Sequence, residues 1–146
     1  MNAPFLQLSV KQRPLLLIAM MRALRSDTTK ISFEGYLAQT GLRKLARASF
    51  DETPVLKRGT LSPRLDFITL PLDQTSCSSI EKAIIPKIPF KNGRGIIHFQ
   101  IERDGELAFA AFDSFQHCIV RTTAVHQGFL DELRERHILH PAAFAP

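Results

Sequence analysis

Tryptophan is absent from this chain of 146 residues, and tyrosine occurs once. These two side chains dominate the energetics of many protein interfaces, so a binding surface here must rely mainly on other residues. Phenylalanine, in contrast, occurs 11 times. Its ring has no polar atom that needs a partner when it is buried. The aromatic content therefore predicts a phenylalanine-rich hydrophobic core.

Cysteine and long apolar runs are also scarce. The two cysteines, Cys77 and Cys118, form neither a CxxC pair nor a Cys/His zinc pattern. Secreted domains of this size usually carry more cysteines, so the count favours a reducing compartment. The longest apolar run, Pro14–Met21, is far shorter than the stretch of about 20 residues that spans a bilayer, and no small-residue cleavage site follows it. We therefore expect a cytoplasmic protein with no signal peptide and no membrane partner.

Motifs that identify an enzyme or a nucleotide-binding protein are missing as well. The glycines of "KNGRGII", residues 91–97, have neither the phosphate-loop spacing nor the dinucleotide-binding spacing, and they lead into a strand pattern. No G-x-S-x-G nucleophile elbow occurs. We therefore predict no cofactor, and we favour a protein that is not an enzyme.

The basic residues are unevenly distributed along the chain. Residues 1–64 have a net charge of +7 and residues 65–146 have −2, which together give +5. Such asymmetry can mark an acidic partner, but scattered basic residues also fit an ordinary solvated surface. Nucleic-acid binding is the weaker interpretation, since no helix-turn-helix and no basic strand with interleaved aromatics is present. The candidate anion or nucleic-acid contacts are Arg43, Lys44, Arg47, Lys57, Arg58 and Arg64.

Hydrophobic patterning predicts a single α+β domain over residues 1–146, with an ordered core over about 10–139 and a loose tail at 140–146. Helices are expected at 14–25, 40–47, 78–85 and 127–139. Strands are expected at 30–37, 64–72, 118–122 and in a hairpin at 96–113. The polar segment 49–63 is the longest predicted loop. Because a tight turn joins antiparallel strands, we predict one mostly antiparallel sheet of four to five strands with helices packed on one face.

The hairpin register follows from its turn. Asp104-Gly105 predicts a two-residue type I′ turn, which pairs Arg103 with Glu106. Continued without interruption, this register gives one wholly apolar face and one mixed face. The mixed face would carry His98, Gln100, Glu102, Leu107, Phe109, Ala111 and Asp113.

Four side chains in and after the hairpin are candidates for catalysis: His98, Asp113, His117 and Cys118. In the predicted register Asp113 is a diagonal neighbour of His98, at about 7–8 Å between α-carbons, so it could orient the imidazole as a base. As an alternative, His98, Asp113 and His117 could supply three ligands to a metal ion. His117 and Cys118 follow one another on a strand and point to opposite faces, so these two are not expected to ligate one metal, and the main prediction is that there is no metal site.

A small enzyme or ligand-binding protein would combine these four residues with Gln100, Glu102 and Phe109 as ligand-binding side chains. The plainer alternative is structural. In it, Asp113 ends the strand, His98 is a half-buried polar residue and Cys118 is a small buried hydrophobe.

The first predicted helix is apolar around most of its circumference, because Pro14–Met21 contains no charged residue. A helix of this kind is buried in the core or against a partner. Since no catalytic motif occurs, the leading hypothesis is a non-enzymatic domain that acts through a protein partner. A second copy of the chain, packed across a two-fold axis, is the first candidate for that partner.

Overall fold

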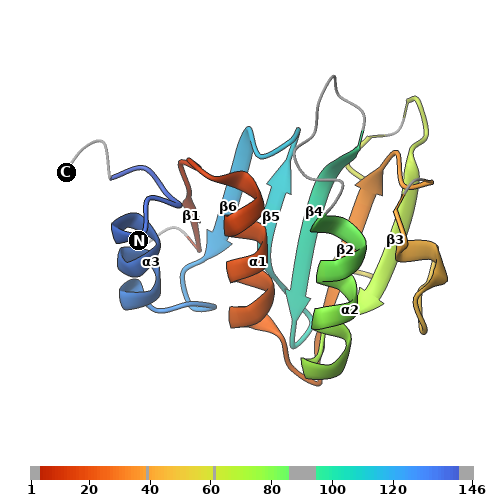
Figure 1. The fold of residues 1–146 in the computed structure, drawn as a ribbon, viewed down its shortest axis with the longest axis horizontal. Coiled ribbons are helices and arrows are strands. Elements are labelled where there is room, and N and C mark those ends of the chain that lie inside the picture. The colour runs from red at the N-terminus through yellow and green to blue at the C-terminus, as the bar shows by residue number, and fades with distance from the viewer. Residues whose placement is uncertain (1–3, 39, 61, 86–94, 142–146) are drawn as a thin grey trace.

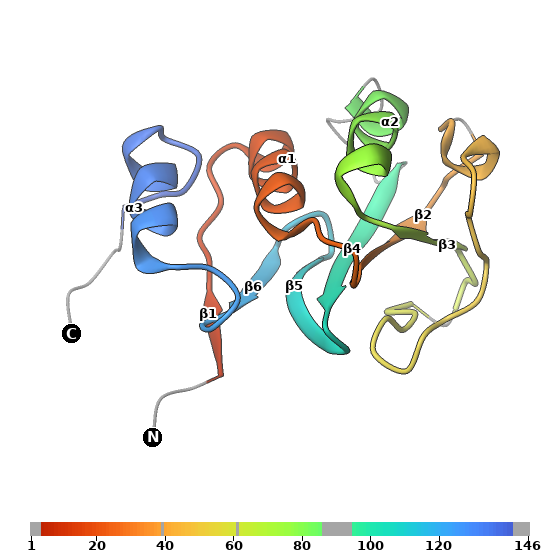
Figure 2. The ribbon, with the colours of Figure 1, turned by 90° about the horizontal axis from the view of Figure 1, so that it is seen from below.

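The computed structural model describes residues 4–38, 40–60, 62–85 and 95–141, and within these ranges three helices cover one face of a six-stranded sheet (Figure 1, Figure 2). The strand order is β1-β6-β5-β4-β2-β3, and each neighbouring pair is antiparallel. The strands are β1 Phe5–Gln7, β2 Thr29–Gly35, β3 Asp66–Pro71, β4 Ile96–Arg103, β5 Glu106–Phe112 and β6 His117–Arg121. The helices are α1 Arg13–Leu24, α2 Gln74–Ile84 and α3 Gln127–Glu135, with a short 3₁₀ helix, η1, at Leu42–Lys44.

The predicted α+β class and the single antiparallel sheet are confirmed, but the predicted strand number was too low. The strand that was missed is β1, which has three residues and pairs with β6 at the sheet edge. A segment this short has no measurable periodicity, so only its pairing reveals it. The helix expected at 40–47 is reduced to the single turn η1. Of the tail expected to be loose, residues 142–146 lie outside the described residues.

Helix α2 begins four residues earlier than the sequence predicted. Its cap is Asp73, whose carboxylate accepts a hydrogen bond from the backbone N–H of Ser76, while the Ser76 hydroxyl accepts one from the backbone N–H of Asp73. The hydrogen bond from the Ser76 N–H, together with the nearby Arg47 guanidinium, lowers the pKa of the Asp73 carboxyl. This reciprocal cap lies directly after β3 and pairs backbone N–H groups at the start of the helix that have no partner within it. The helix can therefore begin as soon as the strand ends.

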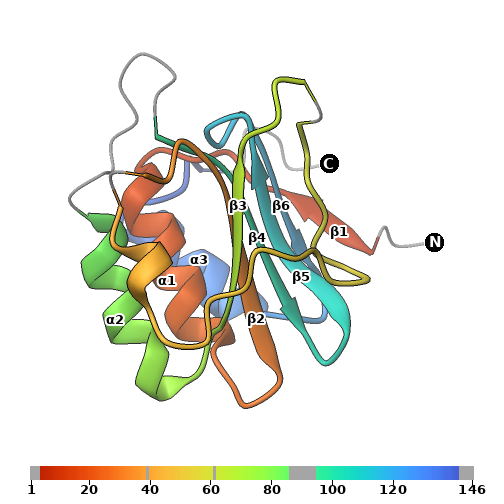
Figure 3. The same cartoon turned by 90° about the vertical axis from the view of Figure 1, so that its right-hand side faces the viewer.

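The main core lies between the sheet and the helices. The rings of Phe33 on β2 and Phe99 on the neighbouring strand β4 pack edge to face, with 5.6 Å between their centroids. Both are fully buried, as is Phe109 on β5. This confirms the predicted phenylalanine-rich core. Figure 3 shows the helices on one side of the sheet and a long irregular segment on the other.

Helix α1 supplies the largest helical share of this core. The wholly buried side chains of the helix are Leu16, Leu17, Met20, Met21 and Leu24. Leu15, on the opposite side, is 45% exposed. Most of the apolar circumference of α1 is thus covered by the protein itself. Among the described residues, no helix has the length and apolarity needed to cross a bilayer.

The hairpin begins as predicted and then changes register. Asp104 and Gly105 have φ angles of 54° and 77°, as a type I′ turn requires, and Arg103 pairs with Glu106. A β-bulge then leaves Ala108 without a counterpart, so that Phe109 pairs with Ile101. The register predicted beyond the Glu102–Leu107 pair was therefore wrong, because a one-residue shift moves side chains to the opposite face.

The bulge removes Phe109 from the mixed face on which it was expected to bind a ligand. Phe109 and Ala111 instead belong to the core under the helices, with no exposed surface. Ala110, opposite Gln100, takes a place on the outer face. The expected ligand-binding role of Phe109 therefore has no accessible side chain to support it.

Two leucines on α1 provide a matched test of this core. Leu17→Ala should lower the free energy of unfolding by about 2–5 kcal/mol, because it removes a buried side chain and leaves a cavity. Leu15→Ala, at a half-exposed position of the same helix, should cost less than about 1 kcal/mol. Urea denaturation followed by circular dichroism measures both. A Leu15→Ala cost that grows with protein concentration would instead place Leu15 in an interface between copies of the chain.

Candidate functional site

Residues 49–60 and 62–65, which we call the strap, cross the outer face of the sheet, opposite the helices (Figure 3). The strap joins the sheet at Ser49, which exchanges two backbone hydrogen bonds with Thr69 on β3, of 2.8 and 2.9 Å. Its Leu56 is wholly buried, and its Arg58 guanidinium lies 5.0 Å from the ring centroid of Phe67. The loop predicted at 49–63 is therefore packed against the sheet.

Alternate residues of β4 hold the strap in place. His98, Gln100 and Glu102 are all buried on the outer face. The Gln100 side chain donates to the carbonyl oxygen of Lys57 at 2.6 Å, and the Glu102 carboxylate accepts from the Thr53 hydroxyl at 2.7 Å. The residues expected to bind a ligand at 100 and 102 thus bind the protein's own chain.

Glu34 on β2 completes this row, at the position opposite His98. It is 1% exposed, and its two carboxylate oxygens accept the backbone N–H groups of Gly59 and Thr60 at 2.6 and 3.1 Å. A carboxylate that accepts two backbone donors is a strong, charge-assisted anchor. Sequence reasoning missed Glu34, although its alternation with Phe33 indicated that it lies on the outer face.

Both ring nitrogens of His98 are engaged. Nδ1 accepts a hydrogen bond from the backbone N–H of Asp113 at 3.1 Å, so Nε2 carries the proton and donates to the Thr60 hydroxyl at 2.7 Å. Gly59 covers the ring so closely that an added Cβ would come within 3.2 Å of it. The side chain is 3% exposed. His98 therefore positions the strap and is not presented to a substrate as a base.

The other catalytic candidates lie apart from His98. Asp113 is exposed and contacts the imidazole through its backbone rather than its carboxylate. His117 is also exposed, whereas Cys118 is wholly buried on the helix side of the sheet. Burial raises the pKa of the Cys118 thiol to about 12, which removes the thiolate that nucleophilic catalysis requires. In the described part of the chain, no three His, Cys, Asp or Glu side chains are grouped so as to hold a metal ion.

Three of the six candidate anion-binding residues are arginines that pair with groups of the protein itself. Arg43 pairs with Asp66 at 3.1 Å and Arg47 pairs with Asp73 at 3.0 Å. Arg58 donates to the carbonyl oxygen of Leu65 at 2.6 Å. The others, Lys44, Lys57 and Arg64, are exposed. The six residues therefore do not act together as one set of free cations.

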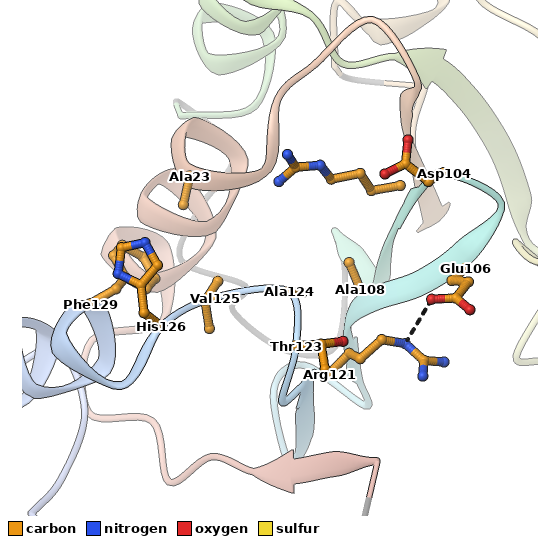
Figure 4. A pocket seen from close by; sticks show the side chains of 11 residues that line it. Ala23, Asp104, Glu106, Ala108, Arg121, Thr123, Ala124, Val125, His126 and Phe129 are labelled. Carbon is orange, nitrogen blue, oxygen red and sulfur yellow. Dashed lines mark ion pairs between the residues drawn. The ribbon is translucent and has the colours of Figure 1, made fainter.

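An open pocket of about 660 Å³ lies elsewhere, where the C-terminal end of α1, the β4–β5 turn and the start of α3 meet (Figure 4). Ala23 on α1, Val125 before α3 and Phe129 on α3 form an apolar wall, and Asp104 and Glu106 lie across from it. The segments that line the pocket are distant in sequence. No local pattern could have identified it.

The charged rim of this pocket is partly fixed by internal contacts. Arg121 donates through Nε to the carbonyl oxygen of Leu107 at 2.9 Å, and the same Nε lies 3.9 Å from a Glu106 carboxylate oxygen. Its guanidinium also lies 4.6 Å from the ring centroid of Phe5. The Asp104 carboxylate accepts the hydroxyl of Thr28 at 2.5 Å.

Arg103, at the end of β4, also lines the pocket and is partly exposed. Within the residues that the structure describes, no ion pair joins its guanidinium. The sequence predicted that Arg103 and Glu106 form a pair at the neck of the hairpin. They are paired in register, but the carboxylate of Glu106 lies near Arg121 instead.

Comparison with known proteins gives no relative: no family model, no curated protein and no solved structure matches the chain. A function has to be argued from the geometry of the strap and of the pocket.

The strap contacts predict that Glu34→Gln loosens the attachment of the strap to the sheet. The amide replaces one acceptor oxygen with a donor, so one of the two backbone N–H groups loses its partner, at a cost of about 1–3 kcal/mol. Trypsin should then cleave after Lys57 or Arg58 faster than in the unchanged protein. Glu135→Gln, at an exposed position on α3, is the control and should leave both stability and cleavage unchanged. Equal digestion rates in the two variants would show that Glu34 does not hold the strap.

The buried thiols give a second test. Cys77 and Cys118 are both free and buried, and burial raises the pKa of each. Neither should react with a colourless disulfide reagent at neutral pH in the folded protein, and both should react once the protein is unfolded in urea. Rapid reaction of a Cys77→Ala variant, in which only Cys118 remains, would contradict the structural role assigned to Cys118.

Proposed function

We propose that the protein is a non-enzymatic binding domain that holds a segment of a partner polypeptide in the pocket between α1, α3 and the β4–β5 turn. The observation that carries this proposal is the pocket itself, whose apolar wall stands opposite charged side chains. Protein interfaces combine buried apolar contacts with polar groups at their edges, and this pocket offers both kinds of surface.

The size of the pocket supports the same conclusion. Its volume of about 660 Å³ lies within the range of about 300–1,000 Å³ that is typical of ligand sites. It has room for several side chains of a bound segment. The opening is bordered by three surface segments, so the chain of the partner could continue past the pocket on either side.

We propose a binding role rather than catalysis because the candidate catalytic residues are bonded within the protein, buried or separated from one another. The imidazole of His98 has both nitrogens bonded within the protein, and the thiol of Cys118 is inaccessible. The side chains that line the pocket include His126 and Thr123 besides carboxylates and arginines. Among the described residues, no hydrogen bond joins the His126 imidazole to a carboxylate or to the Thr123 hydroxyl, whereas such a bond would mark an activated base or nucleophile. A binding role needs no such pair.

Whether the partner is a second copy of the chain stays a prediction. The buried side of α1 needs no partner, which leaves Leu15 as its exposed large apolar residue. Light scattering on the purified protein distinguishes a homodimer from a monomer that binds a different chain, and the pocket proposal allows either.

The proposal is tested by filling the pocket. Ala23 is exposed on α1 and lines the pocket, so Ala23→Trp should block it without disturbing the core. Peptides selected from a random display library on the unchanged protein should bind this variant at least about tenfold more weakly, which is the loss of one well-packed apolar contact. Ala46→Trp, exposed after η1 and outside the pocket, is the control and should bind them normally. Peptides that bind both variants equally would overturn the proposal.

A further inference from the structure

We propose that Arg103 makes the pocket selective for an acidic residue of the bound segment, with its carboxylate on the guanidinium and a neighbouring apolar side chain against α1 and α3. This inference rests on the proposed function, and it names the chemistry of the partner.

Two arginines, Arg103 and Arg121, are among the described residues that line the pocket, and of these two only Arg103 has no ion pair with another described residue. Arg121 is held by the carbonyl oxygen of Leu107 and by the ring of Phe5, and Glu106 lies beside it. The carboxylate of Asp104 accepts the hydroxyl of Thr28. Each carboxylate on the rim thus has a partner other than Arg103.

The surroundings of Arg103 favour a carboxylate over other anionic groups. A planar guanidinium can donate two parallel hydrogen bonds to a carboxylate, which fixes its orientation as well as its charge. The carboxylates of Asp104 and Glu106 stand on the same rim and would repel a more highly charged group such as a phosphate. A carboxylate carries a single negative charge, so the same rim repels it less than it repels a phosphate.

The pocket has an apolar side and a charged side, so a ligand that contacts both needs an apolar group next to a charged one. Figure 4 shows Ala23, Val125 and Phe129 on the side of α1 and α3, and Asp104 and Glu106 on the side of the hairpin. The backbone of Arg103 lies on the hairpin side, because Arg103 is the last residue of β4 before the turn. A segment with adjacent leucine and glutamate residues can therefore contact both sides at once.

The experiment is an amide NMR titration with two short peptides, N-acetyl-Ala-Leu-Glu-amide and N-acetyl-Ala-Leu-Gln-amide. Both should shift the amide signals of Ala124, Val125 and Phe129, which line the pocket. The glutamate peptide should bind about two- to fivefold more tightly at low salt, as expected for one partly exposed ion pair. Added salt should reduce this difference, because it screens the charges.

The matched variants separate Arg103 from the net charge of the protein. Arg103→Gln should abolish the difference between the two peptides and leave the affinity of the glutamine peptide unchanged. Arg136→Gln, at an exposed position after α3 and outside the pocket, removes the same charge and should preserve the difference. The amide spectrum of each variant reports whether it is folded.

The outcomes that contradict the inference are distinct from those that contradict the proposed function. If both peptides bind the unchanged protein equally, or if the difference survives in Arg103→Gln, the selectivity is overturned and the pocket remains a binding site. If neither peptide shifts the pocket signals, while Ala23→Trp also fails to weaken library-selected peptides, the proposed function falls as well.

Discussion

Buried polar side chains have to find hydrogen-bond partners, and on the outer face of this sheet the strap supplies them. Glu34, His98, Gln100 and Glu102 lie side by side on β2 and β4, nearly without exposure to solvent. An unsatisfied group of this kind costs about 1–3 kcal/mol, so four of them together could not be left unpaired in a stable domain. Within the described ranges, no buried side-chain nitrogen or oxygen lacks a partner.

This requirement also gives the sheet its second, smaller core. Because the polar row holds the strap down, Leu56 of the strap is fully enclosed and Phe67 of β3 is 2% exposed. Arg58 adds a cationic cover over the Phe67 ring. The edge strand β3 is protected by the same segment, since Ser49 pairs with its Thr69 and Pro71 ends it. Apolar packing and polar pairing on this face therefore depend on each other.

For function, the molecule therefore has two distinct regions: a closed face, which is the outer face of the sheet under the strap, and an open end, which is the pocket. Of the residues that resembled a site, His98, Gln100 and Glu102 make internal contacts on the outer face, under the strap. The open end lies where α1, the β4–β5 turn and α3 meet without filling the space between them. Charged groups there are only partly paired, which is the condition under which a ligand can add a contact rather than replace one.

Much of the fold could be predicted from local patterns, and the candidate site could not. Strand alternation, the Asp104-Gly105 turn and the apolar run of α1 determined an α+β chain with an antiparallel hairpin and a phenylalanine-rich core. Each of these signals is carried by residues within a few positions of one another. The tertiary structure alone decided the bulge at Ala108, which turned Phe109 inward, and the pairing of the three-residue strand β1. It alone also decided that His98 binds the strap and that Arg103 lines a pocket, because those outcomes depend on packing between segments far apart in the sequence.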